Sequence, residues 1–111
     1  MHRHELLGPW VRRFLLEHIV GERNFSSNTQ RSYRDTLAML LPFLSAQAAR
    51  PLDGLEVIDL SASCVRLFLT HLEQQRRVSV RTRNQRLAGI RSFARFAAEH
   101  SPQQAARQKL L

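Results

Sequence analysis

Residues 79–97, SVRTRNQRLAGIRSFARFA, combine many arginines with no acidic residue. Guanidinium groups bind phosphate oxygens and guanine edges through paired hydrogen bonds, and asparagine or glutamine amides match the edge of adenine. Between Gln74 and Ala98 there are seven arginines and no aspartate or glutamate. Positive charges at that density repel one another unless an anion lies against them. The segment therefore predicts a surface for a polyanion, although a solvated arginine-rich helix would have the same composition.

The apolar residues of this segment begin two helical turns after its start. At about 100° per residue, one face of a helix collects Leu87, Ile90, Ala94 and Ala97, with Phe93 at its edge. From Val80 to Arg86 no apolar stripe exists, so we expect the first two turns to project beyond a core. A projecting helix N-terminus exposes unpaired N–H groups and a partial positive charge, both of which favour phosphate.

An earlier segment also places its polar residues first and its apolar residues later. Ser27-Asn28-Thr29-Gln30 matches a capping box, in which the serine hydroxyl accepts from a backbone N–H and Gln30 reaches back to the cap. The buried side of this helix is expected to consist of Leu37, Leu40, Leu41 and Leu44. The two polar openings could converge as a two-pronged surface, although capping and a solvated first turn explain this segment almost equally well.

The candidate contact residues of this surface come from both segments. The earlier segment supplies Asn28, Thr29, Arg31, Ser32 and Arg34. The later segment supplies Arg77, Arg81, Thr82, Arg83, Asn84, Gln85, Arg86 and Arg91. The arginines are expected to contact phosphate groups, which position a protein on nucleic acid. The candidates for contact with bases or sugars are Thr29, Arg31, Thr82, Asn84, Gln85 and Arg86.

The elements that would position these residues are all helical. Two further helices are predicted, from about Pro9 to Val20 and from the N-cap Ser61 through Gln75. The arginine-rich helix takes Ser79 as its cap and runs to about Glu99. Pro42 should kink the leucine-rich helix or end its regular part, and a turn-rich loop covers residues 50–55. Because no strand signal is long enough to compete, the sequence predicts a small all-α bundle.

The composition limits the class of protein. The chain has 111 residues, of which 43% are hydrophobic, and this is enough for one domain with a real core. A net charge of +8 and a pI near 11.5 favour an anionic partner, with nucleic acid first. The basic residues are arginines with the exception of Lys109, a bias that a GC-rich genome also produces.

The sequence gives little support for a metal site, a membrane segment or a covalent catalytic site. Cys64 is the only cysteine, so neither an intrachain disulfide nor a thiolate zinc site is possible, and we expect it to be a small core residue. The histidines lack ligand spacing, no glycine-rich phosphate loop is present, and no apolar run approaches the length of a membrane span. We therefore expect no metal, no cofactor, no small-molecule substrate and no membrane contact. The expected location is cytoplasmic and associated with the nucleoid.

The order of several short motifs resembles the N-terminal domain of the tyrosine recombinases, the phage-integrase family. Ser27-Asn28-Thr29 followed by Tyr33, Leu37 and Leu41 is similar to the helix that opens the core of that domain. Its third helix is matched by Asp59-Leu60, Val65 and Phe68-Leu69. Its last helix is matched by Ser79, Thr82, Asn84, Leu87, Ile90, Arg91, Phe93 and Phe96. The resemblance covers roughly residues 9–100.

The resemblance implies a four- to five-helix orthogonal bundle, a SAM-like core-binding domain over residues 1–100, with residues 101–111 as a tail or linker. It implies double-stranded DNA as the partner, with the second and fourth helices against the major groove. A separate catalytic domain would cut the other face of the recombination site, and further recombinase protomers would join the assembly. The chain is then expected to be the DNA-binding module of a site-specific recombinase or integrase.

The same resemblance implies that strand cleavage belongs elsewhere. The family's catalytic domain carries two arginines, a His-x-x-Arg motif and a nucleophilic tyrosine. No His-x-x-Arg occurs in this sequence, and its one tyrosine, Tyr33, fits a half-buried packing residue better than a nucleophile. We therefore expect this chain to have no strand-cleaving activity of its own.

Two other functions remain open. A stand-alone helix-turn-helix regulator would prefer a palindromic site, but the connection before Ser79 lacks the usual short glycine-containing turn. A helical protein-interaction domain with a basic face would bind an acidic protein and would not bind duplex DNA. A free-standing enzyme comes last, because no constellation of residues supports one.

Overall fold

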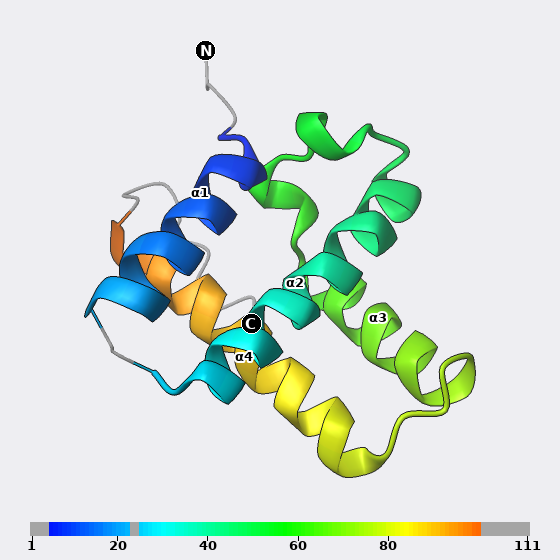
Figure 1. The fold of residues 1–111 in the computed structure, drawn as a ribbon. Coiled ribbons are helices and arrows are strands. Elements are labelled where there is room, and N and C mark those ends of the chain that lie inside the picture. Colours follow the sequence, from blue (N-terminus) through cyan, green and yellow to red (C-terminus); the bar gives the residue numbers. More distant parts are fainter. Residues whose placement is uncertain (1–4, 23–24, 101–111) are drawn as a thin grey trace.

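Helices make up most of residues 5–22 and 25–100, the part of the chain that the computed structural model describes (Figure 1). In chain order they are α1 (Leu7–Arg13), the π-helix η1 (Phe14–Glu22), α2 (Ser27–Ala48), the short 3-10 helices η2 (Leu52–Gly54) and η3 (Val57–Asp59), α3 (Ala62–Gln74) and α4 (Val80–His100). The prediction of an all-α bundle is confirmed. None of the helices in this part of the chain is long and apolar enough to cross a membrane. The predicted tail, residues 101–111, lies outside the described residues.

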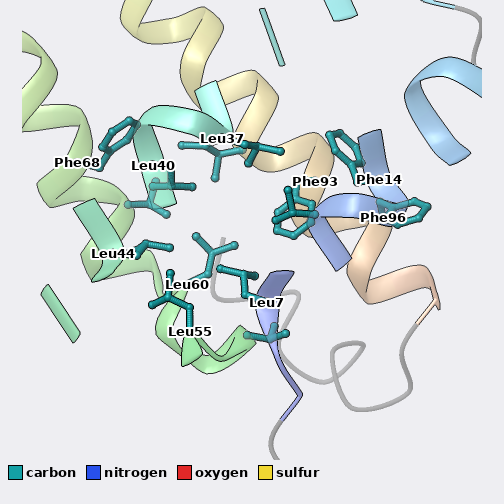
Figure 2. Packing of buried hydrophobic residues seen from close by; sticks show 14 of the residues in the cluster. Leu7, Phe14, Leu37, Leu40, Leu44, Leu55, Leu60, Phe68, Phe93 and Phe96 are labelled. Atoms are coloured by element: carbon teal, nitrogen blue, oxygen red, sulfur yellow. The ribbon is translucent and has the colours of Figure 1, made fainter. Parts of the chain in front are cut away.

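The core collects side chains from all of the longer helices (Figure 2). Phe14 of η1 is fully buried in this core, with ring centroids 5.4 Å from Phe93 and 5.6 Å from Phe96 of α4. The sequence placed Phe93 only at the edge of the buried face and Ala94 within it, and this was wrong, because Ala94 is half-buried while both phenylalanines are buried. Large aromatic rings bury more apolar area than alanine does, so they determine which face of α4 turns inward.

The first helix is not a regular α-helix throughout. It was predicted from about Pro9 to Val20, but α1 begins at Leu7 and gives way at Phe14 to the wider π-helix. Backbone bonds tie the start of α1 to the loop after α2, with the Leu7 N–H donating to the Leu55 carbonyl at 2.9 Å. In this part of the chain, β pairing is limited to one bridge between Leu6 and Glu56. The π-helix buries Phe14 and leaves Val20 exposed.

The caps of α3 and α4 are those predicted, whereas the cap of α2 is one residue earlier. Ser61 and Ser79 accept from the backbone N–H groups of Cys64 at 3.2 Å and Thr82 at 3.1 Å, respectively. The α2 cap is Ser26 and not Ser27, because the Ser26 hydroxyl accepts from Thr29 N–H at 3.2 Å. In place of the predicted bond to the cap N–H, the Gln30 side-chain amide donates to the Phe25 carbonyl at 2.8 Å.

Pro42 lies inside α2, and the helix does not end there. The ring is exposed, and α2 continues to Ala48, where Ala49 closes it in the left-handed conformation at φ 54°. Proline removes one backbone N–H and crowds the carbonyl one turn earlier. On the solvent side of a helix water can satisfy that carbonyl, so the leucines on the opposite face keep α2 intact.

Gly89 sets how closely α2 and α4 approach each other. It is buried, and a β-carbon added to it would lie 3.3 Å from Cδ1 of Tyr33 and 3.6 Å from the Thr36 hydroxyl oxygen. Tyr33 is half-buried and stacks on Phe14 with centroids 6.0 Å apart, which confirms its predicted packing role. The absence of a side chain at residue 89 therefore lets the two predicted contact helices lie against each other.

Candidate nucleic-acid interface

Three arginines and two smaller residues lie on the solvent face of α4. These five exposed residues, spaced three or four apart, are called the α4 stripe: Arg81, Asn84, Ala88, Arg91 and Arg95. This spacing places their side chains on one helical face. All of the polar members except Arg95 were predicted as contact residues from the sequence, and the same spacing identifies Arg95.

The α4 stripe is positively charged and accessible in the described structure. Arg81, Arg91 and Arg95 form no ion pair with any described residue. Ala88, in the middle of the stripe, is exposed and has the smallest side chain of the set. Because the Ala88 side chain is short, a ligand can come close to the helix backbone at this position. The predicted contact residue Gln85 is exposed beside the stripe.

The first turns of α4 do not project freely on every side. Thr82, Arg83 and Arg86 are half-buried, so the expectation that the whole opening extends beyond the core was wrong. Arg83 Nε lies 2.5 Å from the Glu73 carboxylate of α3, and Arg83 also donates to the Asn84 side-chain oxygen at 2.9 Å. The neighbouring helices therefore cover one side of this segment, which sequence periodicity could not show because the covering residues are polar.

Arg86 connects α4 to α2. Its Nη1 donates to the Ser32 carbonyl and to the Thr36 hydroxyl, both at 3.2 Å. The Thr36 hydroxyl in turn donates to the same Ser32 carbonyl at 2.8 Å, and Thr36 is 0% exposed. The Arg86 Nε is buried without a hydrogen-bond partner. Arg86 was predicted as a candidate for contact with a base or sugar, but in this structure its guanidinium points to α2 and joins the two polar segments at one point.

The opening of α2 presents a smaller polar surface. Asn28, Arg31 and Arg34 are exposed, whereas Thr29 and Ser32 are half-buried. The Thr29 hydroxyl accepts from Ser26 at 3.0 Å, and the Ser32 carbonyl is used by Arg86. Three of the five α2 candidates are thus free to reach a ligand.

Arg77 and Arg66 lie next to α4 on two other elements. Arg77 is exposed in the connection between α3 and α4 at φ 53°, in the left-handed region that reverses the chain after α3. Arg66 of α3 was not predicted, because it falls on a helix that looked purely structural. It is exposed at a groove between α3 and α4 that Arg83 and Arg91 also line.

A second hollow in the described structure lies away from α4 and is apolar. It has a volume of about 450 Å³ and lies between α1, η1 and α2, with Val11, Leu15 and Ile19 in its lining. It offers few of the converging polar groups that orient a small substrate. Among the described residues, no group of three or more His, Cys, Asp or Glu side chains could hold a metal ion.

Comparison with known families agrees with this geometry. The model of the family described as "Phage integrase, N-terminal SAM-like domain" matches residues 12–101. The chain belongs to the phage integrase family. The matched region is its N-terminal SAM-like domain, which includes α2, α3 and α4 entirely. The all-α SAM-like fold expected from the sequence motifs is therefore confirmed.

Two similar proteins come from Sinorhizobium fredii (strain NBRC 101917 / NGR234) and are named as candidate integrases/recombinases, y4rC and y4rD. The first is 37% identical over 106 residues, which are 96% of this chain and 32% of that protein. The second is 34% identical over 102 residues, which are 92% of this chain and 36% of that protein. This phage integrase domain thus spans about a third of the length of the relatives it matches. No solved structure matches the chain.

Proposed function

We propose that this chain is the DNA-binding module of a site-specific tyrosine recombinase and that it clamps the recombination site through the α4 stripe. The observation that carries this proposal is the run of exposed, acid-free positions from Arg81 to Arg95. At 1.5 Å per residue the run is about 21 Å long. The major groove of B-DNA is about 12 Å wide and admits an α-helix, so α4 can lie in it over about six base pairs.

Within this arrangement the side chains divide their roles by chemistry. The guanidinium groups of Arg81, Arg91 and Arg95 contact phosphates on either side of the groove and position the helix. Asn84 and Gln85 carry amides that pair with the edge of adenine. Ala88 allows the backbone of α4 to approach the base edges between them.

The opening of α2 adds the second contact of the clamp. Asn28 and Arg31 are exposed within one turn of Ser32, the residue that Arg86 holds against α4. The tie fixes the spacing between the α2 and α4 contacts before DNA arrives, and a preorganised pair of contacts costs less ordering entropy on binding. Arg86 therefore acts on DNA through the position of α2.

We further propose that the chain has no strand-cleaving activity of its own and contributes DNA contacts to recombination or integration. It works beside other recombinase protomers assembled on the same DNA. Its location is the cytoplasm, in association with the nucleoid.

Salt dependence of duplex binding tests the proposal directly. The exposed arginines 31, 34, 77, 81, 91 and 95 would neutralise about six phosphates, so the logarithm of the binding constant should fall against the logarithm of salt with a slope of roughly −5. Fluorescence anisotropy with a labelled duplex gives that slope. A flat salt dependence, or binding to an acidic protein in the absence of any duplex binding, would reject the proposal.

A further inference from the structure

A groove between α3 and α4 is lined by arginines, and two of them, Arg66 and Arg83, do not belong to the α4 stripe. It has a volume of about 290 Å³. Three arginines line it, Arg66 from α3 and Arg83 and Arg91 from α4, and its lining contains no acidic residue. Its floor includes Val65, Leu69 and Ile90, which are all buried.

This mixture of groups suits a phosphate. Guanidinium groups bind phosphate oxygens with paired hydrogen bonds. An apolar floor lowers the local dielectric and strengthens each of those bonds. Arg66 and Arg91 are exposed and form no ion pair with a described residue, so both guanidinium groups are available.

The groove is continuous with the α4 stripe, because Arg91 belongs to both. Chain direction reverses between α3 and α4, and the two helices lie side by side (Figure 1). Arg83 and Arg91 stand eight residues apart on α4, a distance of about 12 Å along the helix axis. An anion in this groove must therefore be extended and must run beside whatever the stripe contacts.

We propose that the sugar-phosphate backbone of one DNA strand lies in the α3–α4 groove and that Arg66 is a phosphate contact supplied by α3. This inference rests on the proposed function, since it assumes that α4 faces duplex DNA. It makes α3 a third DNA-contacting element and gives Arg91 a place between the groove floor and the stripe.

Glu73 sets the strength of this contact. Its carboxylate is paired with Arg83 at 2.5 Å, and both side chains are partly exposed, at 43% and 32%. A phosphate that binds Arg83 must compete with this carboxylate. The pair therefore holds Arg83 in place and at the same time weakens its attraction for DNA, so removal of the acid should tighten duplex binding.

The test uses the whole chain, a labelled duplex and a series of salt concentrations. Arg66→Gln removes one phosphate contact, which should reduce the steepness of the salt slope by about 0.9 and the affinity at 0.1 M salt by about eightfold. Arg66→Lys keeps the charge and should keep most of the slope. Glu73→Gln should raise the affinity severalfold. The matched control is Arg12→Gln, which removes another exposed arginine, from α1, and should change neither quantity.

The outcomes separate this inference from the proposed function. If the unaltered chain binds duplex with a steep salt slope and Arg66→Gln, like Arg12→Gln, leaves the slope and the affinity unchanged, the α3 contact is wrong and the α4 contact stands. If the unaltered chain shows no salt-dependent duplex binding, both fall together. An equal loss in the two glutamine variants would mean that only net charge matters, and this also overturns the α3 contact. Because Arg66 is exposed, circular dichroism should show the same helical content in every variant.

Discussion

A substitution of Arg86 tests most directly which arginines stabilise the fold and which contact DNA. Its guanidinium makes hydrogen bonds of 3.2 Å to the Ser32 carbonyl and to the Thr36 hydroxyl. Arg86→Met retains much of the apolar stem and removes both bonds. A hydrogen bond with one charged partner contributes about 1.5–3 kcal/mol, but both bonds are at the long end of the usual range.

Two further features reduce the expected loss. Thr36 still donates to Ser32 at 2.8 Å after the change, so its hydroxyl keeps one partner. The change also removes the buried Nε that has no partner, and this relieves a desolvation penalty. We therefore expect Arg86→Met to lower the free energy of unfolding by about 1–2 kcal/mol, equivalent to a fall in Tm of about 5–10 °C for a domain of this size.

Arg81→Met is the matched comparison, since it removes the same charge from an exposed position on the same helix. It should change the free energy of unfolding by less than about 0.5 kcal/mol and weaken duplex binding. Urea unfolding followed by circular dichroism measures stability, and anisotropy measures affinity under conditions where both variants are folded. If Arg86→Met unfolds at the same urea concentration as the unaltered chain and loses as much affinity as Arg81→Met, then Arg86 is a direct DNA contact and the reasoning fails.

Three other substitutions test separate parts of the account. Ala88→Glu places an acid in the middle of the α4 stripe and should weaken duplex binding at least tenfold in anisotropy, whereas Ala46→Glu, exposed near the end of α2, should have little effect; equal losses would show that the stripe is not the contact. Gly89→Val puts branched carbon where even a β-carbon lies 3.3 Å from Tyr33, so urea unfolding should show a loss of about 1–3 kcal/mol; an unchanged midpoint would mean that α2 and α4 do not pack this closely. Ser79→Ala removes the hydroxyl that accepts from the first turn of α4 and should cost about 1 kcal/mol in the same assay, with no loss if the cap does not form.

Much of the helical framework was predictable because its signals are local. Ser61 and Ser79 were identified as caps from their own neighbourhoods, and a serine hydroxyl that accepts from the N–H three residues later needs no tertiary contact. The α2 cap was misplaced by one residue because Ser26 and Ser27 are adjacent and sequence alone does not choose between them. Pro42 does not end α2, since the cost of a proline inside a helix depends on whether water can reach the carbonyl one turn earlier.

The types of residue in the candidate site were predictable from the sequence, but the directions in which their side chains point were less so. An acid-free run of arginines marks α4 from the sequence, but which of them face solvent depends on α2 and α3. Arg86 turns inward because Ser32 and Thr36 offer oxygen atoms across the helix crossing, 54 and 50 residues earlier in the chain. Arg66 was not predicted from the sequence, because only the α4 residues that lie beside it in the fold make it a candidate contact.

The most direct test of the central claim is an NMR titration of the isotope-labelled chain with a short duplex at low and moderate salt. If α4 and the opening of α2 contact DNA, salt-sensitive amide shifts will concentrate along α4 from Arg81 to Arg95 and at the opening of α2 from Asn28 to Arg34, with little change around Arg12. Shifts that are absent, or that spread evenly over every arginine in the chain, would contradict it and would leave a basic helical bundle without a defined DNA-binding face.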